Sequence, residues 1–261
     1  MSTENTITEN TTKAYFELRM PDGNASDCVL CHPKGDGDGP WPGVLHLTDI
    51  GGIRPAQIAM VEQLAAAGYT VLMPNLFYRT SRPPVKAPGL DRDKLMARLG
   101  ELTAPLTPGS IAADAQTYLD CLSKHATPGT CGVVGYCYSG AVALRIAAAH
   151  PGRVAAAASF HGGGLYVESD PISPHLALPS VTARLYFGHA VKDPFMPEAS
   201  IEAFDRALAD WGGRFESEVY DGAYHSWTAP DSPVYNAAQA TRAFGKLTAL
   251  LENSLRRLHS S

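Results

Sequence analysis

One cysteine lies in a setting that suits covalent chemistry. Residues 135–140 read Gly-Tyr-Cys-Tyr-Ser-Gly, with Cys137 at the third position. Glycine and serine on either side leave room for a tight, strained turn that exposes the residue at its centre. The thiolate of a cysteine attacks acyl carbonyl carbons and forms a covalent intermediate. Cys137 is therefore the candidate nucleophile.

The flanking residues predict a strand before this turn and a helix after it. Residues 130–134 are short and apolar, as a buried parallel strand would be, and residues 141–150 read as a helix closed by Pro-Gly. A strand, a glycine-bracketed turn and a helix form the nucleophile elbow of α/β-hydrolases. Two other interpretations stay open. Cys137 suits a buried core position, and Ser139 is a rival nucleophile, although no glycine stands two residues before it.

Two further residues complete a possible catalytic set. Asp193 and His225 each follow a predicted strand, at residues 183–188 and 215–220. The carboxyl ends of parallel strands gather functional residues at one edge of a sheet, so we expect both to lie near Cys137. His225 would take the thiol proton, and Asp193 would hold the imidazole in the right tautomer. The order Cys, Asp, His along the chain is that of α/β-hydrolase triads.

Each residue also has a simpler interpretation. Asp193 precedes a proline and would suit a turn or a helix cap, and His225 would suit an ordinary loop. Three such residues at three strand ends in the right order favour the triad. The tetrahedral intermediate also needs an oxyanion hole, for which we predict the backbone N–H groups of Tyr138 and Ile50.

Strands and helices alternate through the chain, which predicts one doubly wound, mostly parallel sheet with helices on both faces. A flexible polar tail is expected over residues 1–13, a single α/β domain over 14–261, and a lid-like excursion over 80–109. The expected strands are 14–20, 27–33, 43–48, 69–74, 130–134, 154–160, 183–188 and 215–220. The expected helices are 55–66, 110–125, 141–150, 198–211 and 234–258.

Composition and charge limit the classes of binding partner that the sequence predicts. A net charge of -5 and a pI near 6.0 give no reason to expect nucleic acid or an anionic membrane. No apolar run approaches the roughly 18–20 residues of a bilayer span, and the polar start lacks the regions of a secretory signal. Five cysteines favour a reducing cytoplasm over a disulfide scaffold. Cys28 and Cys31 would point to opposite faces of a strand, so no metal site is expected.

With these residues in place, the sequence resembles the dienelactone hydrolase family from about Ala14 to the final helix. The resemblance rests on residues 135–140, on Gly-His-Ala-Val-Lys-Asp at 188–193, on Tyr-Asp-Gly-Ala-Tyr-His-Ser at 220–226, and on Met-Pro-Asn-Leu-Phe-Tyr-Arg at 73–79. It implies an α/β-hydrolase fold, cofactor-free hydrolysis of lactones or esters, and ring opening of dienelactone (carboxymethylenebutenolide) as the named activity.

The resemblance also implies roles for residues outside the triad. An acidic side chain after the third strand modulates the resting thiol in the family, and the matching residue is Asp49, one methylene shorter than the family's Glu. Its other interpretation is helix capping. Two arginines hold the substrate carboxylate in the family; Arg79 matches the first, while Ala229 stands at the second. Aromatic residues would then shape the pocket, and the expected substrate-binding residues are Arg79, Tyr78, Trp227 and His161.

The sequence thus predicts a cytoplasmic, cofactor-free hydrolase, monomeric or homodimeric, that acts on a small lactone or ester. A general carboxylesterase, a non-catalytic ligand-binding member of the fold and a thiol redox protein are the alternatives.

Overall fold

The computed structural model describes residues 4–7, 10–34, 39–85 and 92–255. The chain divides after Thr127 into two compact units, residues 1–127 and 128–261, and each is described by itself. The single domain expected over 14–261 stays a prediction. No helix among the described residues combines the length and apolar character that crossing a bilayer requires.

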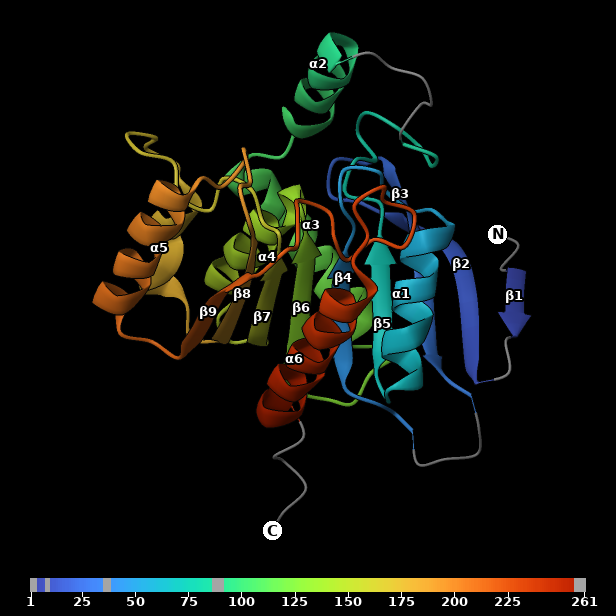
Figure 1. The fold of residues 1–261 in the computed structure, drawn as a ribbon. Coiled ribbons are helices and arrows are strands. Elements are labelled where there is room, and N and C mark those ends of the chain that lie inside the picture. The colour runs from blue at the N-terminus through green and yellow to red at the C-terminus, as the bar shows by residue number, and fades with distance from the viewer. Residues whose placement is uncertain (1–3, 8–9, 35–38, 86–91, 256–261) are drawn as a thin grey trace. The chain divides into compact units, whose positions relative to one another are not determined.

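The first unit contains strands in the order β1-β2-β3-β5-β4 (Figure 1). Only β4 and β5 pair in parallel; the others pair antiparallel. Every residue of β4 and β5 is buried, which explains their continuous apolar sequence. The strands are β1 (Glu4–Ile7), β2 (Thr11–Arg19), β3 (Ala25–Pro33), β4 (Gly43–Leu47) and β5 (Thr70–Pro74).

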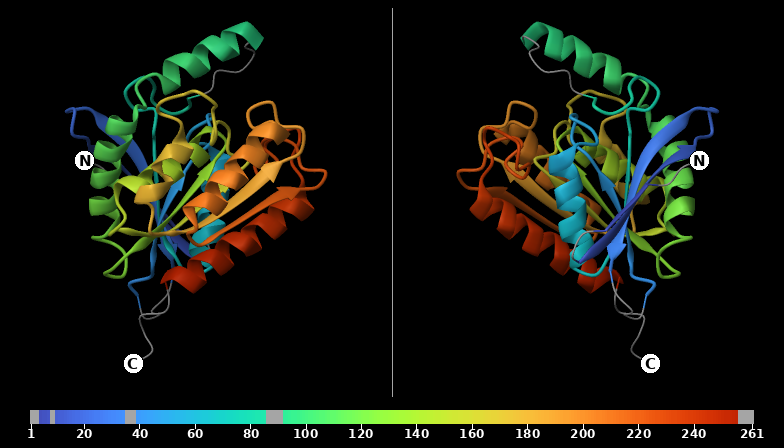
Figure 2. Two further views of the ribbon diagram at one scale, coloured as in Figure 1. Left: turned by 90° about the vertical axis from the view of Figure 1, so that its left-hand side faces the viewer. Right: turned by 90° about the vertical axis from the view of Figure 1, so that its right-hand side faces the viewer.

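Helices cover both faces of this unit's strands. α1 (Pro55–Ala66) packs on β3 and β5, and α3 (Pro108–Leu122) packs on β4 and β5 from the opposite side (Figure 2). Both begin with proline in the first turn, where a missing N–H costs nothing. The Thr107 hydroxyl accepts a hydrogen bond from the Ser110 N–H and fixes the start of α3.

Two segments that the sequence predicts as a tail and as an excursion contain regular structure in the described residues of the first unit. The expected tail over residues 1–13 includes β1 and the start of β2, whose backbones pair from Glu4 opposite Tyr15 to Ile7 opposite Thr12. Polar residues can form this pairing because backbone hydrogen bonds do not depend on side-chain type. The excursion over 80–109 contains α2 (Arg92–Thr103). Residues 86–91 lie outside the described residues, and a lid role stays a prediction.

The second unit is a fully parallel set of strands in the order β6-β7-β8-β9. They are β6 (Cys131–Tyr136), β7 (Val154–Phe160), β8 (Arg184–Ala190) and β9 (Phe215–Tyr220). Because they run in the same direction, the loops after all four strands emerge at one edge (Figure 1). This arrangement confirms the parallel strands expected around the predicted triad.

Helices also cover both faces of the second unit. α4 (Tyr138–Ala149) and α5 (Glu198–Trp211) both contact the 3-10 helix η1 (Pro174–Ser180). α6 (Ala237–Leu255) packs on β7 and β8 from the other face. On β8, Phe187 contacts Phe204 of α5, whereas the adjacent Tyr186 lies beneath Lys246 of α6. This alternation places α5 and α6 on opposite faces.

The turn between β6 and α4 has a strained backbone. Cys137 sits at φ 57° and ψ -128°, a region that side-chain-bearing residues rarely adopt. The Ser139 hydroxyl accepts a hydrogen bond from the Tyr136 N–H at 2.9 Å and lies 3.0 Å from the Tyr136 carbonyl oxygen. A Cβ on Gly135 would lie 2.0 Å from the Ser139 carbonyl oxygen, so only glycine fits there.

We expect Gly135→Ala to destabilise the protein by about 3 kcal/mol, because the added methyl group meets the backbone of Ser139 rather than a flexible side chain. The matched control is Gly152→Ala, where an added Cβ has no neighbour within 4 Å. Urea unfolding of both variants checks this. Equal stability of the two would contradict the packing described for the elbow.

Candidate active site

Three side chains of the second unit form a hydrogen-bonded chain at the carboxyl ends of its strands. Cys137 follows β6, Asp193 lies three residues beyond β8, and His225 follows β9. His225 Nε2 lies 3.0 Å from Cys137 Sγ, and His225 Nδ1 lies 2.7 Å from Asp193 Oδ2. The imidazole thus bridges thiol and carboxylate, as nucleophile activation by a base and an orienting acid requires.

The carboxylate of Asp193 is buried and fixed. The residue is 3% exposed, and its second oxygen accepts a hydrogen bond from the Phe195 N–H at 2.9 Å. This contact within the loop after β8 leaves Oδ2 directed at His225. The turn role that the sequence allowed for Asp193 therefore occurs together with the contact to the histidine.

Burial and hydrogen bonding oppose each other at His225. Burial alone would lower the pKa of the imidazole, but its hydrogen bonds to Asp193 and Cys137, together with their charges, raise that pKa to about 10. The ring therefore favours the imidazolium form near neutral pH. Such a ring holds a proton that can be passed to a leaving group.

The elbow also places a backbone donor beside the thiol. Tyr138 is the first residue of α4, and the N–H groups of a helix's first turn have no acceptor within the helix. Ser139, the rival nucleophile, is 0% exposed, and its hydroxyl lies within the turn against the Tyr136 backbone. That position fits a structural role. In the first unit, the N–H of Ile50 makes no hydrogen bond with another described residue, and its role in an oxyanion hole stays a prediction.

Most of the chain matches one protein family. Residues 27–255 match the model of the dienelactone hydrolase family. The chain belongs to this family. It is 30% identical over 232 residues to a carboxymethylenebutenolidase of Rhodococcus opacus, a match that covers 87% of this chain and 88% of the relative. A putative carboxymethylenebutenolidase of Escherichia coli K12 is 26% identical over 233 residues, with 87% of this chain and 82% of the relative covered.

Solved structures show the same fold. A putative dienelactone hydrolase from Klebsiella pneumoniae aligns with a TM-score of 0.82 at 21% identity, covering 92% of this chain and 98% of that one. The predicted α/β-hydrolase fold is confirmed, and the chain is a hydrolase of the ester- and lactone-cleaving family.

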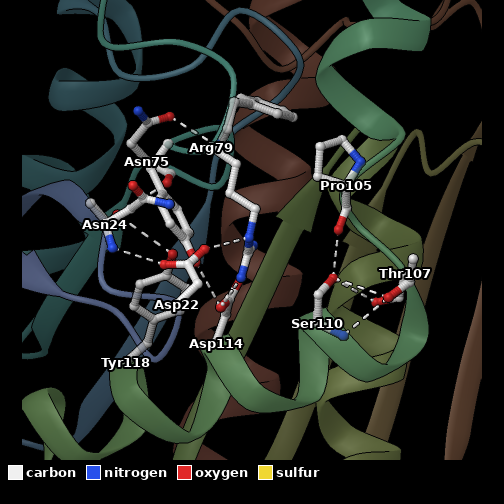
Figure 3. A network of polar contacts seen from close by, with 12 residues as sticks. Asp22, Asn24, Asn75, Arg79, Pro105, Thr107, Ser110, Asp114 and Tyr118 are labelled. Carbon is white, nitrogen blue, oxygen red and sulfur yellow. Dashed lines mark hydrogen bonds and ion pairs between the residues drawn. The ribbon is translucent and has the colours of Figure 1, made fainter.

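Arg79, the residue that the family resemblance assigns to a substrate carboxylate, pairs with carboxylates of its own unit. Its Nη1 and Nη2 lie 2.6 and 2.8 Å from the two oxygens of Asp114, and its Nε lies 2.7 Å from Asp22 (Figure 3). The hydroxyl of Tyr78 bonds to both carboxylates, at 2.9 and 3.1 Å. The two expected substrate-binding residues thus belong to one ion cluster with two negative charges and one positive charge.

Asp49 is likewise engaged within the first unit. Its two oxygens pair with the guanidinium of Arg54 at 2.6 and 2.7 Å and accept from the Gly51 N–H and the Gln57 amide. The helix cap that the sequence allowed is not formed, because Arg54 occupies the N-cap position of α1 and makes no side-chain cap. A role in modulating the thiol stays a prediction.

The other two expected substrate-binding residues are buried in the second unit. Trp227 is 0% exposed and stacks on Tyr220, with ring centroids 4.9 Å apart. His161 is 1% exposed, and both its ring nitrogens have partners. Sequence reasoning missed Phe195, whose half-exposed ring lies 4.9 Å from that of His225. Its position two residues after Asp193 was the available signal.

We expect the His225 ring to stay protonated until the pH nears 10 and Asp193→Asn to lower its pKa, because the variant removes the charged acceptor. Because the folded-state pKa lies above the ordinary value of about 6.5, the protonated ring contributes its full stabilisation of the fold below about pH 6.5. This contribution is lost as the pH rises through about 10. Nitrogen-detected NMR titration of the histidines checks this, and a wild-type ring that titrates near pH 6.5 would contradict it.

We expect Arg79→Met to lower the free energy of unfolding by about 3 kcal/mol, because it leaves the buried Asp114 carboxylate without its charged partner. The Arg79→Met/Asp114→Asn double variant should recover part of that loss. Urea unfolding of the two single variants and the double variant measures the coupling. Strictly additive losses would show that the pair contributes nothing to stability.

Proposed function

We propose that the protein hydrolyses a lactone or carboxylic ester through a thioester on Cys137. The observation that carries this is the continuous contact from Sγ through the His225 ring to Asp193, at 3.0 and 2.7 Å. Family membership supports the same class of substrate. The five cysteines, all with free thiols, and the reasoning from composition support a cytoplasmic location as part of the proposal.

In the first half of the reaction, the Cys137 thiolate attacks the carbonyl carbon. The oxyanion that forms lies next to the strained elbow, where the Tyr138 N–H is a donor. The C–O bond of the ester breaks, and His225 gives its proton to the leaving oxygen. In a lactone that oxygen remains attached to the acyl group, so the ring opens.

In the second half, water cleaves the thioester. The neutral His225 ring takes a proton from the water, and the hydroxide attacks the acyl carbon. The C–S bond breaks and returns the thiolate beside the imidazolium, while the product leaves as a carboxylic acid. Asp193 keeps its negative charge throughout and stabilises the imidazolium form.

The leading activity is dienelactone hydrolysis, in line with the relatives' names. A carboxylesterase for uncharged substrates is the second candidate, and one observation favours it. The guanidinium of Arg79 already serves two carboxylates in the first unit, so it offers no unsatisfied charge to a third. Phe195 adds an apolar ring beside His225.

Kinetics of ester and lactone cleavage test the proposal. We expect Cys137→Ala to lose at least about 1000-fold in kcat/KM on p-nitrophenyl acetate and on dienelactone, because both substrates need the nucleophile. Cys121→Ala, which removes a buried thiol of α3, is the control and should retain activity. Near-wild-type turnover by Cys137→Ala would reject the thioester mechanism.

The substrate class is tested with dienelactone and its neutral methyl ester. If Arg79 serves only its own cluster, Arg79→Met should change kcat/KM for both substrates by a similar factor. A selective loss of about 100-fold on the charged substrate alone would instead assign Arg79 to the substrate carboxylate. Measurements well below the unfolding temperature of the variant separate activity from stability.

A further inference from the structure

His161 makes direct contact with the backbone of Cys137. The residue follows β7 as Cys137 follows β6, and the two strands pair in parallel with Tyr136 opposite Phe160. The Cys137 N–H is 3.1 Å from the His161 Nδ1 and also 3.1 Å from the Phe160 carbonyl oxygen. The Cys137 N–H is thus shared between a side-chain acceptor and a backbone acceptor, and Cys137 is the elbow residue with a positive φ.

The other ring nitrogen reaches the loop that carries His225. His161 Nε2 lies 2.8 Å from the hydroxyl of Thr228, three residues after His225. The His161 ring also packs edge-on against the rings of His225 and Trp227, with centroids 5.3 and 5.0 Å apart. One imidazole therefore joins the backbone of the nucleophile to the loop of the base.

These contacts set the tautomer of His161. A backbone N–H can only donate, so Nδ1 must accept and Nε2 must carry the proton that it donates to Thr228. A protonated ring would place an N–H against the Cys137 N–H. Burial, and secondarily the nearby His225, lower the pKa of His161 well below its usual range, which keeps the ring neutral.

The local backbone shows that this placement is imposed by its surroundings. His161 has φ 42°, in the left-handed region, and its N–H donates to the Gly188 carbonyl oxygen at 2.7 Å. His161 is 1% exposed, and its two ring nitrogens and its backbone N–H all have partners within the described residues, so none of these groups is left for a substrate. Its ring instead contacts the Cys137 N–H on one side and, on the other, Thr228 and the ring of His225.

We propose that His161 is a positioning residue that holds the Cys137 backbone, and the loop of His225 through Thr228, so that Sγ and Nε2 stay within reach of each other. This role deepens the proposed function and rests on it. Misplacement of a nucleophile by about 1 Å can cost about 100-fold in rate. The bond from the Cys137 N–H to Nδ1 is the part of the arrangement that a substitution can isolate.

Three substitutions separate the two bonds. His161→Asn keeps an oxygen near the position of Nδ1, His161→Gln reaches toward Nε2 and leaves the Cys137 N–H without its side-chain acceptor, and His161→Phe keeps a ring without either nitrogen. The measurements are kcat and KM on p-nitrophenyl acetate and the rate at which iodoacetamide alkylates Cys137, followed by peptide mass spectrometry. Alkylation needs no ester substrate, so it reports on the thiol directly.

We expect His161→Phe and His161→Gln to lower kcat and the alkylation rate by about 10- to 100-fold with little change in KM. His161→Asn should stay within about threefold of wild type, a rescue that a purely space-filling role does not predict. Equal rates for the Asn and Gln variants, or wild-type rates for folded His161→Phe, would overturn the proposal. If His161→Phe does not fold, the Asn and Gln pair decides, because both variants carry an amide.

The proposed function and the positioning role can fail separately. Retained hydrolysis in Cys137→Ala would reject the thioester mechanism, whereas the alkylation rates of the His161 variants would still show whether His161 positions the thiol.

Discussion

The strained backbone of Cys137 is the constraint on which the second unit's site depends. A φ of 57° turns the Cys137 side chain out of the β6–α4 connection, and several local contacts hold the backbone in this conformation. Gly135 removes a Cβ that would meet the Ser139 carbonyl oxygen, Ser139 closes the turn on Tyr136, and His161 accepts from the Cys137 N–H. Such strain persists only where the surroundings over-determine it, and here they place the thiol 3.0 Å from His225.

Charge is distributed differently in the two units. In the second unit a buried carboxylate faces a histidine, and together with the thiol it raises the histidine's pKa to about 10. In the first unit, Arg54 and Arg79 are each paired with buried carboxylates, Asp49 and Asp114. Paired charges of this kind are costly to break and offer little to a ligand. The charges of Arg54 and Arg79 are therefore satisfied by side chains of their own unit.

Much of the architecture could be predicted because each element has a strong local signal. The apolar runs of β4, β5 and β7, the proline at the start of α1 and the glycine after α5 specify their elements, and α1, α5 and β9 have the predicted bounds. Strand ends and chain order led to the expectation that Cys137, Asp193 and His225 lie close together, and their side chains are in contact; their role as a catalytic triad is a proposal. The partners of Arg79 and His161 could not be predicted, since Asp114 and Thr228 lie 35 and 67 residues further along the chain and meet them only through tertiary packing. The strand β1 was missed because its polar sequence has no alternation.

Trapping the covalent intermediate would show directly whether Cys137 is the nucleophile. The protein is mixed with p-nitrophenyl acetate, quenched in acid within the first turnover, digested and examined by peptide mass spectrometry. We expect one acetyl group on the peptide that contains residues 135–140, attached to Cys137 and absent from Cys137→Ala. Acetylation of Ser139 instead, or hydrolysis with no acyl group on Cys137, would contradict it.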